Sequence, residues 1–68
     1  MVVSVNGERR ELPAGVTVEG LVALLSDAPE GRGVAVAVAG EVVPRGAWRT
    51  TELTDGALVE VVAAVQGG

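Results

Sequence analysis

The sequence predicts an α+β fold in which one helix covers a mixed sheet of about five strands. Hydrophobic residues make up 49% of the 68 residues, and most of them are valine and alanine. Valine is β-branched and favours strands over helices. Alternating apolar segments occur in the first, middle and last parts of the chain, and only residues 18–25 repeat with the period of a helix.

The first predicted element is a β-hairpin over residues 1–12. Apolar and polar residues alternate in its first strand. Asn6-Gly7 is a strong signal for a two-residue turn, because both residues tolerate positive φ. Residues 9–12 form the returning strand, which Pro13 ends.

A helix follows the hairpin. Thr17 is a plausible N-cap, and Glu19 stands in the first turn, where the helix dipole favours a negative charge. Gly20 disfavours the helix by about 1 kcal/mol relative to alanine. The apolar stripe outweighs that cost, and we expect the helix to end near Ser26. The stripe consists of Val18, Leu21, Val22 and Leu25.

Two short strands come next, over residues 34–39 and 41–43, and Pro44 stops the second of them. Residues 45–54 are expected to be irregular, with Trp48 packed against the core. The longest strand is predicted over residues 57–65, after an Asp55-Gly56 turn. Its inward face would carry Val59, Val61, Ala63 and Val65.

The predicted element order is ββαβββ. A helix between two hairpins has to cover one face of their sheet, because neither element can bury its apolar side alone. The last strand can then lie parallel to the first at the centre of the sheet. This arrangement is the β-grasp, or ubiquitin-like, fold. We expect residues 1–68 to form one such domain with a flexible tail at residues 66–68.

The composition leaves few groups for catalysis. The chain has no cysteine, histidine, tyrosine or lysine, so neither thiolate metal sites nor Ser–His pairs can form. Its net charge of −4 argues against nucleic acid and anionic membranes as partners. No basic leader followed by a long apolar run is present, and no stretch approaches the roughly 18 apolar residues that cross a bilayer. We therefore expect a cytoplasmic protein that is not an enzyme.

The closing Gly67-Gly68 pair is the candidate functional site. Glycines carry no side chains and leave the backbone free, so the tail, with Gln66 and Gly67 leading to Gly68, could thread into the narrow active site of another protein. There the free carboxylate of Gly68 could be joined to a nucleotide phosphate, which supplies the leaving group that a carboxylate lacks. The alternative is an inert chain end.

Several short runs together resemble the ThiS family, the sulfur carriers of thiamine biosynthesis. No single run is specific, but their order and spacing are, and they extend over nearly the whole chain. The runs are Val5-Asn6-Gly7-Glu8, Val16-Thr17-Val18, Val42-Val43-Pro44-Arg45, Trp48, Leu53-Thr54-Asp55-Gly56, Val59-Glu60-Val61-Val62 and Val65-Gln66-Gly67-Gly68. The sequence departs from the family pattern at Ala39, where asparagine is usual, and at Ala57, where aspartate is common.

The resemblance implies a mechanism and a set of partners. A ThiF-like adenylyltransferase would use ATP to adenylate Gly68, and sulfur from a cysteine desulfurase would convert it to a thiocarboxylate. The thiocarboxylate would then serve thiazole synthase. The ATP belongs to the partner enzyme, so we expect no stably bound cofactor or metal on this chain and a monomer when it is free.

Pro44, Arg45 and Trp48 are candidate partner-binding residues on the same resemblance. Each also has a structural interpretation: Pro44 as a strand terminator, Arg45 as a solvated surface charge and Trp48 as the largest side chain of the core. The core interpretation of Trp48 is the favoured one.

Three other functions remain open. The small subunit of molybdopterin synthase shares the fold and the Gly-Gly end, although the region from Pro44 to Trp48 favours the thiamine carrier. A ubiquitin-like modifier would join its C-terminus to target lysines. A plain β-grasp interaction module would have an inert tail.

Overall fold

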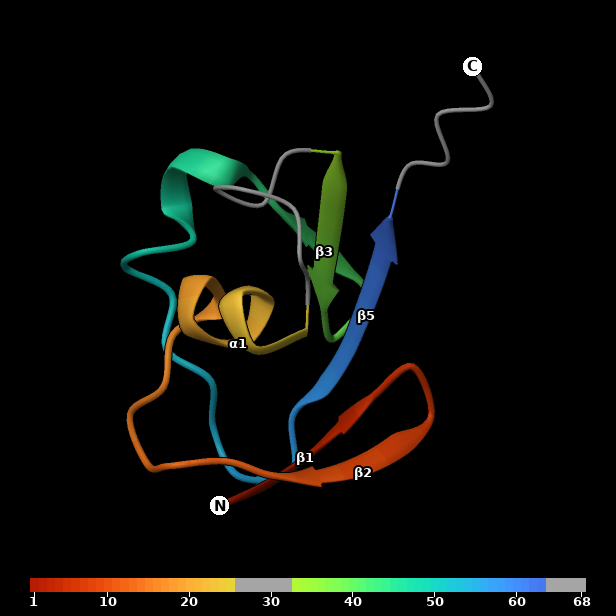
Figure 1. The fold of residues 1–68 in the computed structure, drawn as a ribbon, viewed down its shortest axis with the longest axis vertical. Coiled ribbons are helices and arrows are strands. Elements are labelled where there is room, and N and C mark those ends of the chain that lie inside the picture. Colours follow the sequence, from red (N-terminus) through yellow and green to blue (C-terminus); the bar gives the residue numbers. More distant parts are fainter. Residues whose placement is uncertain (26–32, 64–68) are drawn as a thin grey trace.

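A computed structural model describes residues 1–25 and 33–63, which form a five-stranded mixed sheet with one helix on one face (Figure 1). The predicted α+β class and element order are confirmed. The elements are β1 (Val2–Val5), β2 (Glu8–Glu11), α1 (Val18–Leu25), β3 (Val34–Val38), β4 (Glu41–Val43), the 3₁₀ helix η2 (Arg45–Ala47) and β5 (Leu58–Ala63).

Some predicted boundaries differ from the structure or lie beyond its description. The last strand begins at Leu58 rather than at Ala57. Its predicted end at Val65, the predicted helix end near Ser26 and the tail at residues 66–68 lie outside the described residues.

The strand order in the sheet is β2-β1-β5-β3-β4. β5 therefore occupies the centre, where it pairs in parallel with β1 and antiparallel with β3. This confirms the predicted place of the last strand beside the first. The two outer pairs, β1–β2 and β3–β4, are antiparallel hairpins.

Both hairpins turn through two residues with positive φ. Asn6 and Gly7 have φ values of 53° and 82°, as the Asn-Gly signal predicts. Ala39 and Gly40 have the same values, 53° and 82°. Alanine has no side-chain group that compensates for this conformation, so the second turn is the less favourable of the two.

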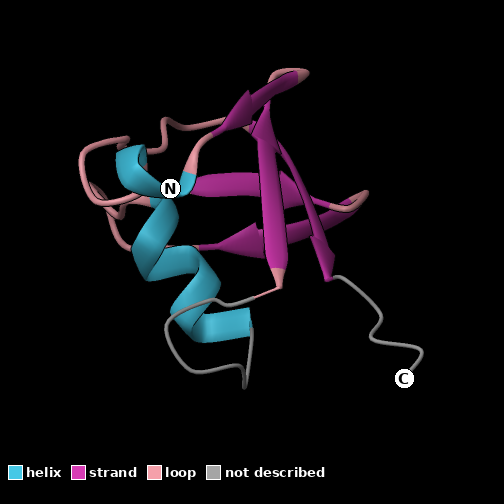
Figure 2. Cartoon of the chain, turned by 90° about the horizontal axis from the view of Figure 1, so that it is seen from above, coloured by secondary structure: helices cyan, strands magenta, loops and turns pink. Residues whose placement is uncertain are grey.

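The core lies between the helix and the inner face of the sheet. Figure 2 shows from above that the helix lies along one side of the strands. Val18, Leu21 and Val22 of the predicted stripe are buried, and Leu25 packs against them. The predicted N-cap is confirmed, because the Gly20 amide donates to Thr17 Oγ1 at 3.1 Å. The sheet side of the core includes Val3, Val5, Val36 and Val59.

Residues 45–54, expected to be irregular, contain η2 and then cover the start of α1. The amides of Val18 and Glu19, which have no partner within the helix, donate to the carbonyls of Thr51 and Trp48 at 2.9 and 3.2 Å. The segment therefore completes the helix N-terminus.

Trp48 is packed into the core, as the favoured interpretation of the sequence predicted. Only 4% of its surface is exposed, and Nε1 donates to the Val43 carbonyl at 2.9 Å. A buried indole N–H without a partner would cost stability, so this hydrogen bond makes the site suitable for tryptophan. Leu53, from the same segment, is also buried.

Candidate functional site

The predicted site consists of Gln66, Gly67 and Gly68, which lie outside the described residues. The structure does describe β5, the strand that precedes them. β5 ends at Ala63, and five further residues, 64–68, complete the sequence. At most about 3.5 Å of chain per residue limits the distance from Ala63 to Gly68 to about 18 Å. Any active site that receives the Gly68 carboxylate must come within that distance of the end of β5.

Pro44 and Arg45 leave the sheet at the same end as β5. β4 and β5 are both antiparallel to β3, so they run in the same direction. Val43 and Val61 both pair with Val36, on opposite sides of β3, and the two strands therefore finish close together. Figure 1 shows η2, which follows β4, at the end of the molecule to which the β5 arrow points. The structure thus brings two of the candidate partner-binding residues to the end from which the tail continues.

The three candidate partner-binding residues differ in what they present to a partner. Pro44 and Arg45 are exposed, whereas Trp48 is buried. The Arg45 guanidinium carbon lies 5.9 Å from the centroid of the Trp48 ring, within the range of a cation–π contact. Arg45 therefore covers the tryptophan that closes the core, and Trp48 itself offers little surface to another protein.

The sheet carries exposed apolar side chains on the face opposite the helix. Val42, Leu58 and Val62 are 74%, 65% and 63% exposed, and we call them the outer apolar face. Leu58 and Val62 alternate with the inward residues Val59 and Val61 along β5, so they point away from the core.

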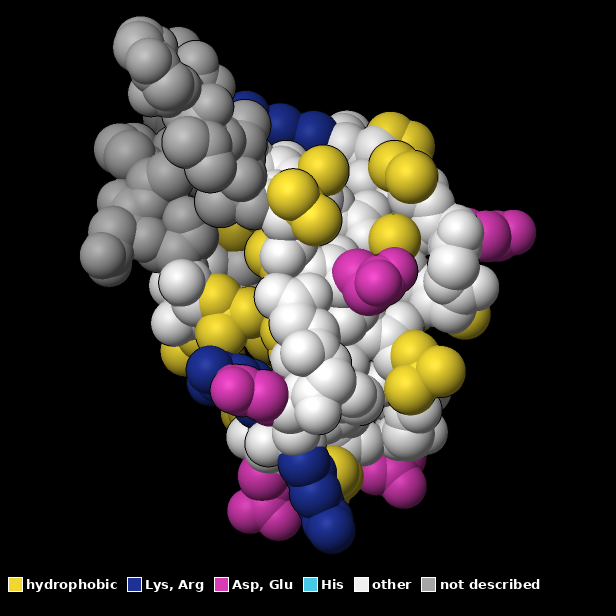
Figure 3. All heavy atoms as spheres, turned by 90° about the vertical axis from the view of Figure 1, so that its right-hand side faces the viewer, with side chains coloured by type: hydrophobic (Ala, Val, Ile, Leu, Met, Phe, Trp, Pro, Cys, Tyr) yellow, Lys and Arg dark blue, Asp and Glu magenta, His cyan; other side chains and the backbone are white. Residues whose placement is uncertain are grey.

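Sheet register places Val42 on the same side as Leu58 and Val62. Ala37 pairs with Val42 on one side and with Glu60 on the other, and directly paired residues point to the same face. Figure 3 looks onto this side and shows separate hydrophobic side chains with an acidic side chain among them. The sequence analysis did not identify this face, although the period-two alternation in β5 was a signal that could have found it.

Side chains extend the pairing of β1 with β5 at both ends. At the start, the Val2 amide donates to Asp55 Oδ1 at 2.8 Å, and the Gly56 amide donates to the Val2 carbonyl at 2.7 Å. At the other end, the Asn6 side chain makes two hydrogen bonds with the backbone of Val61. The strand that precedes the tail is therefore held along most of its length.

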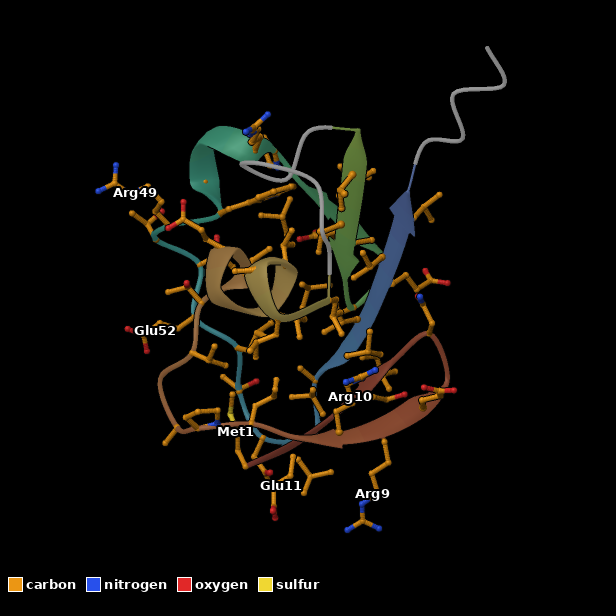
Figure 4. The ribbon with its side chains drawn as sticks, in the orientation of Figure 1. Met1, Arg9, Arg10, Glu11, Arg49 and Glu52 are labelled. Carbon is orange, nitrogen blue, oxygen red and sulfur yellow. The ribbon has the colours of Figure 1, made fainter. Side chains whose placement is uncertain are left out.

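Four of the five charged side chains that Figure 4 labels lie at the periphery. Arg9 and Glu11 project from β2 away from the sheet, and Arg49 and Glu52 lie beyond the helix on the far side of the molecule. Within residues 1–25 and 33–63, no three His, Cys, Asp or Glu side chains are grouped so as to hold a metal ion. No helix of these residues has the length and apolar character needed to cross a membrane.

In residues 1–25 and 33–63, the sheet order, the helix that covers one face and the central place of β5 define a β-grasp protein. Comparison with known proteins narrows this class. The model of the ThiS family matches residues 3–68, nearly the whole chain. The chain belongs to the ThiS family, whose members are small sulfur carrier proteins of thiamine biosynthesis.

Two solved structures from Geobacter metallireducens are similar to the chain. A crystal structure of the thiamine biosynthesis protein ThiS is 31% identical, with a TM-score of 0.82 and full coverage of both chains. A solution NMR structure of a thiamine biosynthesis protein is also 31% identical, with a TM-score of 0.80, and covers 100% of this chain and 88% of that one. No curated protein matches the chain.

Proposed function

We propose that this protein carries sulfur as a thiocarboxylate at Gly68 and donates it for thiazole formation. A ThiF-like adenylyltransferase joins the Gly68 carboxylate to the α-phosphate of ATP, and pyrophosphate leaves. The terminal sulfur of a persulfide, which originates from a cysteine desulfurase, then attacks the acyl carbon and displaces AMP. A thiol reduces the resulting acyl disulfide, which releases the thiocarboxylate and leaves the thiol oxidised in a disulfide. The thiocarboxylate is a nucleophile at neutral pH and passes its sulfur to thiazole synthase. In this scheme the chain is a co-substrate of its partners and supplies no catalytic side chain.

The observation that carries the proposal is the family match, which extends to Gly68 at the end of the sequence. The composition agrees with it, because a chain without histidine, cysteine, tyrosine or lysine has few groups for chemistry of its own. Gln66 and Gly67 lead Gly68 into the active site of the enzyme. The last two residues are glycines without side chains, so this end of the chain can enter a narrow nucleotide site.

The outer apolar face is proposed as the surface that docks on the adenylating enzyme. Leu58 and Val62 project from β5, the strand that continues into the tail. An active site within about 18 Å of Ala63 brings the body of the enzyme against this end of the domain. Burying these exposed apolar side chains against the enzyme would remove apolar surface from water, which favours association. Pro44 and Arg45, at the same end of the sheet, would lie at its edge.

The test of the function is a mass measurement. Incubation of the protein with a ThiF-like enzyme, ATP and a sulfur source should raise its mass by the difference between one sulfur and one oxygen atom. Deletion of Gly68 should abolish the change while the circular dichroism spectrum stays that of the folded domain. Replacement Gly67→Trp should block adenylation, because an indole cannot pass where a glycine does.

Other outcomes would identify other functions. Covalent adducts with target proteins and no thiocarboxylate would indicate a ubiquitin-like modifier. Restored molybdopterin synthesis, without restored thiazole synthesis, would indicate the small subunit of molybdopterin synthase. A protein lacking Gly68 that still supports thiazole synthesis in a carrier-deficient strain would contradict the tail as the site.

A further inference from the structure

β5 loses its backbone partner on one side before it ends. The parallel pairing with β1 covers Ser4 with Leu58 and Val5 with Val59, and β1 then turns away at Asn6. On its other side β5 stays paired with β3 as far as Ala63. Residues 60–63 lead to the tail. With backbone partners alone, they would be held only on the side that faces β3.

The side chain of Asn6 replaces the missing backbone partner. Its Nδ2 donates to the Val61 carbonyl at 3.0 Å, and its Oδ1 accepts from the Val61 amide at 2.8 Å. The backbone amide of Asn6 also donates to the Val59 carbonyl at 2.9 Å. An amide side chain presents an N–H donor and a C=O acceptor side by side, as a strand residue does, so Asn6 adds one more step to the parallel ladder.

This role is separate from the role of Asn6 in the turn. The φ of 53° favours asparagine, but glycine and aspartate tolerate positive φ as well. Glycine has no side chain for the two bonds, and aspartate has an acceptor but no donor. The turn therefore does not explain by itself why the residue is asparagine, whereas the contact with Val61 does.

We propose that Asn6 is a positioning residue for the chemistry at the tail. This inference rests on the proposed carrier function. Val61 stands two residues before the end of β5, and the tail has at most about 18 Å of reach beyond Ala63. If the last residues of β5 move away from the sheet, a carrier docked on its enzyme presents Gly68 at the wrong distance or angle. A displacement of about 1 Å is enough to slow an enzymatic step markedly.

The test compares two variants of the same turn. Asn6→Gly keeps the net charge and the positive φ and removes both bonds to Val61. Gly7→Ala is the matched control: its Cβ meets no atom within 4 Å, but φ of +82° strains it, so it weakens the turn without affecting the Asn6 side chain. Asn6→Asp keeps one of the two bonds. All variants are measured at a temperature where circular dichroism shows them folded.

We expect Asn6→Gly to lower kcat of adenylation by about threefold to tenfold, with KM for the carrier unchanged, because docking is intact and only delivery of the tail is impaired. By NMR, the Val61 amide should exchange with solvent about tenfold faster relative to the other β5 amides, because it loses its acceptor. Asn6→Asp should lie between Asn6→Gly and the unaltered protein. Gly7→Ala should leave kcat and the relative exchange of Val61 unchanged.

Each other result has a defined meaning. If Asn6→Gly and Gly7→Ala behave alike in both measurements, Asn6 is only a turn residue and the proposal is wrong. If Asn6→Gly raises KM and leaves kcat unchanged, Asn6 contacts the enzyme and does not position the strand. If the unaltered protein is not adenylated at all, the proposed function fails, and unchanged Val61 exchange in Asn6→Gly would then overturn the anchoring of β5 as well.

Discussion

Ala39 adopts a conformation that its side chain does not favour. Its φ of 53° lies in the left-handed region, which costs an alanine about 1–2 kcal/mol. The sequence analysis identified this position because the family usually has asparagine there. The amide of Ala39 also donates to the Leu58 carbonyl at 2.8 Å, so the turn is tied to β5 and cannot relax by itself.

Replacement Ala39→Asn should therefore stabilise the protein by about 1 kcal/mol, since asparagine tolerates positive φ. In a domain of this size that corresponds to a rise in Tm of about 4–8 °C, measured by thermal unfolding. Ala14→Asn is the control, because Ala14 is exposed in a turn without positive φ. An equal change in Tm for both variants would contradict the strain at Ala39.

Side-chain packing explains the glycine at position 20 inside α1, because Val16 leaves little room for a Cβ there. A Cβ at this position would come within 2.9 Å of Val16 Cγ2, and valine has little rotamer freedom to move aside. Gly20→Ala should thus raise the free energy of unfolding by less than the about 1 kcal/mol that helix propensity alone predicts. In a Val16→Ala background, Gly20→Ala should raise it by the full amount. A double-mutant cycle measured by urea unfolding tests the clash, and no coupling between the two positions would refute it.

Residues differed in how far the sequence could predict their roles. Thr17 was predicted as an N-cap because its cap bond is local. Asn6 was predicted only as a turn residue, because its partner Val61 is 55 positions away in the sequence. Only the register of β1 against β5 brings them together, and periodicity does not determine register. The exposed apolar side chains of β5 were missed because the analysis followed its inward face.

At the scale of elements, the segment from η2 to Leu53 works as part of the core although it has little regular structure. It supplies Trp48 and Leu53 as buried side chains, and its carbonyls accept from the first amides of α1. The sequence predicted the packing of Trp48 from its size but called the segment irregular. The 3₁₀ turn follows Pro44 and is closed by the Ala47 amide, which donates to the Pro44 carbonyl at 2.8 Å.

Trp48→Ala should lower the free energy of unfolding by about 3–5 kcal/mol, because it removes the largest core side chain and leaves a cavity. A domain of this length has a total stability of about 3–10 kcal/mol, so the variant should be substantially unfolded. Trp48→Phe keeps much of the volume but leaves the Val43 carbonyl without its donor, and should cost about 1–3 kcal/mol.

The measurement for both tryptophan variants is urea unfolding followed by far-ultraviolet circular dichroism. Leu24→Ala is the control, because Leu24 is 66% exposed on α1. A loss of stability in Trp48→Ala no greater than that in Leu24→Ala would show that residues 45–54 do not hold the core.

At the scale of the whole molecule, the two faces of the sheet differ in what covers them. The inner side packs on α1, and the outer side carries Val42, Leu58 and Val62 in solvent. The sequence predicted the sheet and its covering helix, because the alternation and the helical stripe are properties of the chain itself. It could not predict the docking role that we propose for the outer side, because that role depends on a second molecule.

The outer apolar face should contribute to binding of the adenylating enzyme but not to folding. A double variant, Leu58→Gln with Val62→Thr, should raise KM for the carrier about tenfold while kcat is retained, as expected for the loss of interface side chains. Leu24→Gln, at a similarly exposed position on the helix, should leave KM unchanged. If all variants have the KM of the unaltered protein, the enzyme docks elsewhere. This pattern is the reverse of the one expected for Asn6→Gly, so docking and delivery can be separated.

The central place of β5 also has a consequence during synthesis. β5 is the last described element to leave the ribosome, yet it lies between β1 and β3 and joins the two hairpins into one sheet. Neither hairpin can complete the core before β5 has emerged, because isolated hairpins are marginally stable in water. A nascent chain that stalls before Leu58 therefore cannot form the native sheet and remains open to proteolysis. Translation past β5 is thus a condition for presenting a carrier to its partners.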